Sequence, residues 1–221
     1  MRVSGSSTLP DGKINDDLVS TGTTKINGNL ECEGFKSSGS LNGKGNLIVH
    51  RDFRNSGTFN LIGSLSVDGD AKSTGTTTID GEIRIIGEYI KSGTLRAGNH
   101  LEAINGMKMS GLSKIKGNLM SKKDVEIRGN ATIDGNIKAD NISIGMPIDR
   151  RPIKHPYKIH GNLIADNTIN IKKTFVGGDI KGRDVIIEYG TEVVGAVYYI
   201  NSIEVSSRAT LAKKPMQIKE E

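Results

Sequence analysis

Glycine recurs in this sequence at a fixed spacing, and that spacing limits the folds that the chain can form. Six glycines lie 18 residues apart, namely Gly39, Gly57, Gly75, Gly93, Gly111 and Gly129. Within this period, glycine also recurs every six residues from Gly57 to Gly93. A constant period over many units is typical of proteins whose repeats stack on one another. Collagen is excluded, because 28 glycines in 221 residues fall far short of one in three.

Between the glycines, apolar and polar residues alternate with period two. Odd-numbered residues from 57 to 85 are mainly glycine or aliphatic, whereas even-numbered ones are mainly Thr, Asn, Ser or charged. This alternation predicts short strands with one buried face. Each 18-residue coil then holds three strands separated by bends, and residues 18 apart lie above one another.

Columns of like residues support this stacking. One column contains Leu47, Leu65, Ile83, Leu101, Leu119 and Ile137, and another contains Leu61, Ile79, Ala97, Ile115 and Ile133. The sequence therefore predicts an all-β chain, a three-sided parallel β-helix (solenoid) of about ten 18-residue coils. The single Cys32 has inward parity, which predicts a small buried hydrophobic residue.

The repeat predicts one domain with short ends. We expect a short polar tail over residues 1–11, a single β-helix domain over 12–211 and a C-terminal tail over 212–221. A one-residue deletion between Gly34 and Gly39 moves the inward positions from even to odd numbers. Residues 146–156 leave the repeat and hold three of the five prolines, which predicts a loop.

The loop has two interpretations. It is either an insertion tolerated on the solenoid surface or a basic docking site for an acidic partner or a lipid headgroup. In the second case the docking residues are Arg150, Arg151 and Lys154.

No catalytic, cofactor-binding or metal-binding site is expected. Asp80 and Asp134 share an outward column but are three coils apart, too far for paired carboxylates. The spacing of the residues implies no carboxylate partner for any of the four histidines. Lys91 has inward parity but lies near a corner, where we expect its side chain to turn outward. The N-terminus shows no signal peptide and no stretch approaches 18 apolar residues, so a soluble cytoplasmic protein is expected.

Two groups of apolar residues predict contacts with other molecules. Ile86, Ile90 and Ile104 have outward parity and are candidates for lateral contact. At the C-terminal end, the last coil carries Tyr199, Ile203, Val205 and Leu211 on its inward parity, and neither end of the chain offers an obvious cap. An uncovered solenoid end exposes unpaired backbone groups and an apolar cross-section, which predicts self-association there.

The repeats also resemble those of a known family. The segments GNATIDGNIKADNISIG (129–145) and GGDIKGRDVIIEYGTEVVGAVYYINSIEVSS (177–207) are similar to bactofilin repeats, with Gly-x-Ile/Val coils and short acidic or Asn-containing bends. The resemblance implies a right-handed β-helix that polymerises head to head and tail to tail without nucleotide or other cofactor. It further implies a non-enzymatic cytoskeletal scaffold serving cell shape, envelope organisation or motility, often at the inner face of the membrane or with membrane-bound proteins. No nucleic acid is expected among the partners.

Two other classes remain open. Hexapeptide-repeat acyltransferases are trimeric enzymes that also have 18-residue triangular coils, and His155 or His160 would then be the catalytic candidate. In that class, however, the aliphatic residue directly precedes the glycine, whereas here it stands two residues before or after it, as in Ile79-Asp-Gly81-Glu-Ile83. The third class is a carbohydrate-binding or adhesin solenoid, against which the scarcity of aromatic residues counts.

Overall fold

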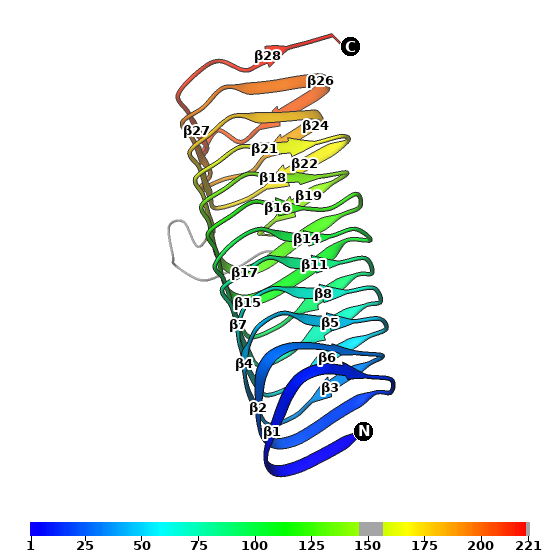
Figure 1. The fold of residues 1–221 in the computed structure, drawn as a ribbon. Coiled ribbons are helices and arrows are strands. Elements are labelled where there is room, and N and C mark those ends of the chain that lie inside the picture. The colour runs from blue at the N-terminus through cyan, green and yellow to red at the C-terminus, as the bar shows by residue number, and fades with distance from the viewer. Residues whose placement is uncertain (146–156, 220–221) are drawn as a thin grey trace.

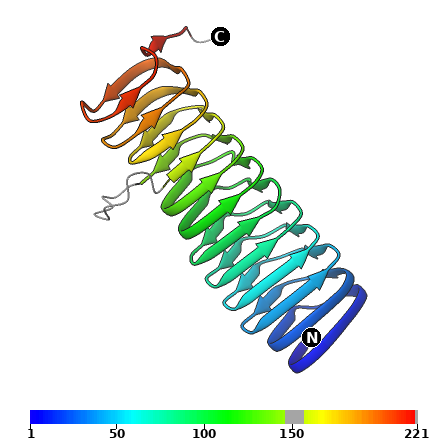
Figure 2. The same ribbon diagram turned by 90° about the vertical axis from the view of Figure 1, so that its left-hand side faces the viewer.

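The computed structural model describes residues 1–145 and 157–219, and all of its regular elements are strands. Figures 1 and 2 show them wound into a single parallel β-solenoid, with the two termini at opposite ends of the rod. The solenoid has about 11 turns with a spacing near 18 residues. The predicted three-sided parallel β-helix is thus confirmed.

The strands form three sides, which we call A, B and C in the order in which the chain winds. Side A contains β3 (Phe35–Ser37), β6 (Phe53–Asn55), β9 (Ala71–Ser73), β12 (Tyr89–Lys91), β19 (Ile142–Ile144) and β22 (Thr168–Ile171). Side B contains β4 (Ser40–Lys44), β7 (Thr58–Ile62), β10 (Thr76–Ile79), β13 (Thr94–Ala97), β20 (Tyr157–Ile159), β23 (Thr174–Val176), β25 (Glu192–Val193) and β27 (Thr210–Leu211). Side C contains β5 (Leu47–Val49), β8 (Leu65–Val67), β11 (Ile83–Ile85), β14 (Leu101–Ala103), β16 (Leu119–Met120), β18 (Ile137–Ala139), β21 (Leu163–Ala165) and β28 (Met216–Gln217).

Six longer strands continue around corners. Near the N-terminus, β1 (Arg2–Ile14) and β2 (Leu18–Cys32) run through all three sides. In the middle, β15 (Met107–Ile115) and β17 (Val125–Ile133) run from side A to side B. Near the C-terminus, β24 (Ile180–Ile187) and β26 (Val197–Val205) run from side C to side A.

The strands pair in parallel with the predicted register. Ile83, for example, pairs with Leu65 below it and Leu101 above it, each 18 residues away. Across the segment 146–156 the offset grows, so that Ala131 pairs with Tyr157. The extra residues of that segment therefore leave the winding of the coils unchanged.

The predicted deletion lies at the corner between Cys32 and Phe35, slightly before the expected position. Between Leu18 and Ala139, inward residues have even numbers up to Cys32 and odd numbers from Phe35 onward. Only Glu33 and Gly34 form this corner, whereas the next coil uses three residues, 50–52, at the same place. This coil is thus a residue short, as is the later coil from Val125 to Ile142.

The alternation places apolar side chains inside. Leu101 has no exposed surface, and its stacked neighbours Ile83 and Leu119 are also buried. Near the N-terminus the core is aromatic: the ring centroids of Phe35 and Phe53 are 5.1 Å apart and those of Phe53 and Phe59 are 5.2 Å apart. Such pairs add to the stabilisation from burial.

Cys32 lies inside the solenoid, as its parity predicts. Its side chain is fully buried, and burial raises the pKa of the thiol to about 12. A thiol with such a pKa stays protonated at neutral pH, so it behaves as a small apolar residue.

A ladder of side-chain hydrogen bonds follows the corner between sides B and C. At most levels, a side chain accepts a hydrogen bond from a backbone N–H of the next coil. The Oδ1 of Asn118 accepts from Asn136 N at 2.9 Å, and the Oδ1 of Asn136 accepts from Asn162 N at 2.8 Å. Further acceptors in this ladder are Asp11, Asn29, Asn46, Ser64, His100, Asn162 and Asp179. These bonds satisfy backbone donors at the bends, where strand pairing is interrupted.

The two expected tails contribute strands instead. Residues 1–11 form most of β1, which pairs with β2, because their small polar residues lie under equally small residues such as Thr24 and Gly22. Within 212–221, β28 pairs with β26 at Tyr198 and Tyr199. The solenoid therefore extends further at both ends than the sequence pattern indicates.

Lys91 corrects another expectation, because its side chain turns inward. It is fully buried, and its Nζ donates to the carbonyl oxygens of Gly75 at 2.6 Å and Ser92 at 2.9 Å. Carbonyl groups at the corner thus replace the carboxylate that a buried ammonium group commonly requires.

Candidate functional site: the C-terminal end face

The last coil ends with inward residues that no further strand of the described residues covers. Val205 stands one coil above Ile187, and Ile203 stands one coil above Val185. Ile187 and Val185 are buried, with 1% and 0% of their surface exposed, whereas Val205 is 41% exposed. Ile203 is partly buried against the core. The two uppermost inward positions of side A thus form an open apolar surface.

Side B ends in the same way. Its last strand, β27, carries Leu211 above the buried Val193. Leu211 and Ala209 are partly buried hydrophobic residues that pack against the core. Within the described residues, no strand pairs with the far edge of β27.

Side C is covered by one additional strand, β28. The N–H of Ile218 donates to the carbonyl oxygen of Tyr199 at 2.8 Å, and Gln217 Nε2 donates to the carbonyl oxygen of Ile200 at 2.9 Å. As a result, Val197 below this strand is fully buried. We call the uncovered surface of Ile203, Val205, Ala209 and Leu211 the end face.

The structure therefore brings the four predicted self-association residues to one end of the rod. Ile203, Val205 and Leu211 belong to the end face, while Tyr199 lies beside it under Gln217. Figures 1 and 2 show β26, β27 and β28 together at the C-terminal end.

The residues predicted to make lateral contacts lie at two separate places on the surface. Ile86 and Ile104 stack at the corner between sides C and A, where Ile86 follows β11 and Ile104 follows β14. Ile90 lies in the middle of β12, between Lys72 and Lys108 in its column, and is 36% exposed. Side A around Ile90 is charged, so no continuous apolar patch joins the three residues. The predicted docking residues Arg150, Arg151 and Lys154 lie outside the described residues.

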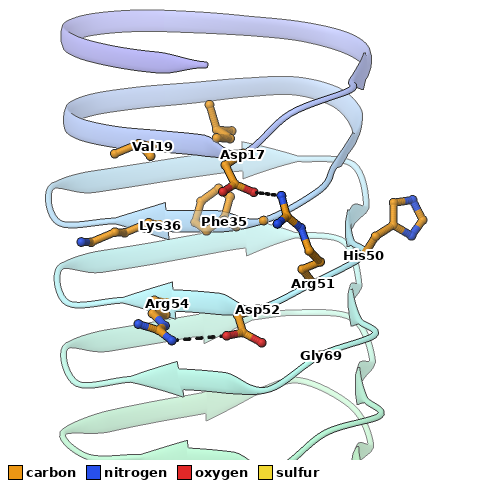
Figure 3. A pocket seen from close by; sticks show the side chains of 11 residues that line it. Asp17, Val19, Phe35, Lys36, His50, Arg51, Asp52, Arg54 and Gly69 are labelled. Atoms are coloured by element: carbon orange, nitrogen blue, oxygen red, sulfur yellow. Dashed lines mark hydrogen bonds and ion pairs between the residues drawn. The ribbon is translucent and has the colours of Figure 1, made fainter.

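A groove lies near the other end of the rod, at the shortened corner. It encloses about 510 Å³ and includes Gly34 and Phe35. Figure 3 shows that Arg51 reaches across this corner, and its guanidinium lies 2.6 Å from a carboxylate oxygen of Asp17, two coils away. Because residues 33–34 form a corner one residue shorter than its neighbours, the surface is recessed between Asp17 and Arg51.

The groove is lined by charges of both signs. Arg54 pairs with Asp52 at 3.3 Å, and Lys36 stands below Arg54 in the same outward column. Since the guanidinium groups are already paired with carboxylates, the groove offers no concentrated charge of one sign to a ligand.

His50, next to this groove, has two carboxylate partners that the sequence analysis missed. Its Nε2 is 2.7 Å from Glu31 and its Nδ1 is 3.0 Å from Asp68. Hydrogen bonding to Glu31, then to Asp68, raises the pKa of His50 above its ordinary value. Asp68 lies 18 residues after His50, so the period itself could have identified this pair.

His160, the candidate of the acyltransferase interpretation, also has a carboxylate neighbour. Its Nδ1 is 3.1 Å from Asp134, and its ring packs edge-on against Phe175 with centroids 6.4 Å apart. Asp134 and His160 stand in one outward column of side B. Among the described residues, no group of three or more His, Cys, Asp or Glu side chains is arranged to hold a metal ion.

Cations without carboxylate partners are concentrated on side B. Arg96 and Lys114 are stacked, and Lys116 and Lys158 lie nearby on the same side; all four are exposed. None of them forms an ion pair with another described residue, whereas Arg84 on side C pairs with Glu102 and Lys108 on side A pairs with Glu88. These four unpaired cations therefore all face outward on side B.

No described helix has the length and apolarity needed to cross a lipid bilayer. Searches against protein families, curated proteins and solved structures find no match for this chain.

Proposed function

We propose that this protein is a non-enzymatic scaffold that assembles end to end into filaments without nucleotide or metal. The observation that carries the proposal is the end face, where Val205 is 41% exposed although the residue below it in the same column is buried. A further coil supplied by a second molecule would bury this apolar surface and form hydrogen bonds with its free strand edges. Both the burial and the hydrogen bonds would stabilise the contact. The resemblance to bactofilins supports the same proposal and suggests roles in cell shape, envelope organisation or motility.

The experiment replaces residues of the end face by lysine. Ile203→Lys and Val205→Lys place a charge where the next coil would lie, so assembly should stop while the rest of the solenoid stays folded. Sedimentation velocity measures assembly, and circular dichroism measures the β content. Asn42→Lys is the matched control for an added positive charge, because Asn42 is exposed and points outward on β4, away from the end face. Variants that retain β structure and still sediment like the wild-type polymer would refute the proposal.

We also propose that the scaffold contacts an anionic membrane surface through side B. The support is electrostatic: side B is built from parallel strands in register, and its four central cations have no carboxylate partners among the described residues. Basic surfaces of this kind are attracted to anionic lipids over about one Debye length.

A further inference from the structure

The opposite end of the rod carries the first coil, β1, which also has a free edge. Its inward residues lie under those of β2: Val3 under Ser20, Leu9 under Ile26 and Ile14 under Cys32. Leu9 is buried, and Val3 and Ile14 are partly buried hydrophobic residues packed against the core. Both ends of the rod therefore present a coil with an apolar inner row.

We infer that the end face accepts the β1 coil of a second copy of this chain, stacked in the same parallel register as the internal coils. The inference rests on the proposed function and adds the polarity of the assembly. It predicts head-to-tail contacts, in contrast to the head-to-head and tail-to-tail contacts that the family resemblance implies.

The inner columns continue across such a junction with apolar contacts. The column of Val205 passes through Ile187 and Ile171 and reaches Ser20 and then Val3 at the N-terminal end. Extending it by one coil places Val3 of the next copy on Val205. By the same register, Leu9 falls on Leu211 and Met1 falls on Ile203. Ile203, Val205 and Leu211 thus each meet an apolar side chain, whereas by the same register Ala209 meets the small polar Ser7.

The outward columns continue with opposite charges. Arg2 belongs to the column of Val19, which ends at Glu204 after Ile186. Stacking a second copy therefore places Arg2 directly on Glu204. The corner ladder starts at Asp11, whose carboxylate accepts a hydrogen bond from Asn29 N, and its last donor is the N–H of Ala196. Lys214 lies 18 residues after Ala196 and therefore occupies the next level of this column. Asp11 is thereby placed on Lys214, the second pair of opposite sign.

The winding of the coils is compatible with the same junction. β28 lies on side C, and β1 begins on side A, which follows side C in the winding order. A stacked β1 would therefore meet the part of β26 on side A and the strand β27 on side B, above which no strand lies within residues 1–145 and 157–219. A head-to-tail junction that repeats without closing generates an open filament.

The decisive experiment mixes two full-length variants, each blocked at one end. Val3→Lys blocks the N-terminal coil and Val205→Lys blocks the end face; sedimentation velocity is measured for each alone and for an equimolar mixture. Head-to-tail assembly predicts that each variant alone is monomeric and that the mixture forms heterodimers, because one intact end of each kind remains. A dimer formed by either variant alone would overturn the inference, as would a mixture without heterodimers under conditions where the wild type assembles. Failure of the wild type to assemble at all would instead refute the proposed function, and with it the inference.

A charge exchange tests the register of the junction. Glu204→Arg places two arginines against each other and should weaken assembly roughly fivefold, as expected for an exposed pair. The double variant Glu204→Arg with Arg2→Glu restores opposite charges and should recover wild-type assembly. Lys108→Glu, a charge reversal remote from both ends, is the matched control. If the double variant assembles no better than Glu204→Arg, then Arg2 does not face Glu204 and the proposed register is wrong.

Discussion

The ammonium nitrogen of Lys91 lies 2.6 Å from the carbonyl oxygen of Gly75, inside the solenoid and away from any carboxylate that the structure describes. Burial lowers the pKa of this lysine from 10.5 to about 8. The folded protein therefore binds a proton at this site less tightly than the unfolded chain does. Lys91 is consequently a source of pH-dependent stability.

The first prediction concerns this pH dependence. Between pH 8 and 10.5 the unfolded chain keeps the proton on Lys91 while the folded protein has released it, so the free energy of unfolding should rise with pH. The expected rise is roughly 1–3 kcal/mol after allowance for solvent screening. Lys91→Met, which matches the Met109 above it, should remove this rise. Urea unfolding of both proteins at several pH values measures it, and identical pH profiles would contradict the prediction.

A second prediction tests the inward columns. Leu101→Ala should lower the free energy of unfolding by ~2–5 kcal/mol, because it leaves a cavity between Ile83 and Leu119. Glu102→Ala next to it should cost less than about 1 kcal/mol, since Glu102 points outward and forms an exposed ion pair with Arg84 at 3.1 Å. Chemical denaturation compares the two. Equal losses would be incompatible with the observed alternation.

The third prediction concerns the corner ladder. Asn118→Ala removes the acceptor for Asn136 N and should cost about 1 kcal/mol. Asn60→Ala serves as a control, because its side chain bonds only the exposed Asn42 side chain among described residues and should cost less than about 0.5 kcal/mol. Thermal unfolding of both variants should show that Asn118→Ala destabilises the protein more than Asn60→Ala does; equal destabilisation would contradict the role given to the ladder.

The fourth prediction concerns side B. Co-sedimentation with vesicles that contain anionic phospholipid should decrease when Arg96, Lys114 and Lys158 are replaced by alanine, and it should weaken as salt is added. Replacing the paired cations Arg84, Lys108 and Arg128 should have a smaller effect, because each already faces a carboxylate. Equal effects of the two triple variants would show that side B has no special role.

The repeat made most of the fold predictable from sequence. Leu101 and its column could be identified because an 18-residue period and an alternation of two together determine which residues stack and which point inward. The same arithmetic placed Tyr199, Ile203, Val205 and Leu211 at one end, since they share the inward parity of the last coil. The same period relates His50 to Asp68, because these two residues are 18 apart and therefore stand one coil from each other.

Other features depend on details that a period does not contain. The parity of Lys91 pointed inward, but its burial depends on the carbonyl groups of Gly75 and Ser92, whose orientation is a property of the bend. Residues 1–11 look like a tail because Ser7 and Gly5 are small and polar, yet they lie under Thr24 and Gly22, which are similar. The position of β28 over Tyr199 likewise depends on a backbone hydrogen bond that the sequence does not indicate.

The most direct test of the account is negative-stain electron microscopy of the purified wild-type protein without nucleotide. End-to-end assembly of the solenoid through Val205 and its neighbours predicts long unbranched filaments that are a single rod in width or bundles of such rods, and it predicts short particles for Val205→Lys. Discrete trimers would favour the acyltransferase interpretation. Wild-type rods that stay single at high protein concentration would contradict the proposal that the end face joins one molecule to the next.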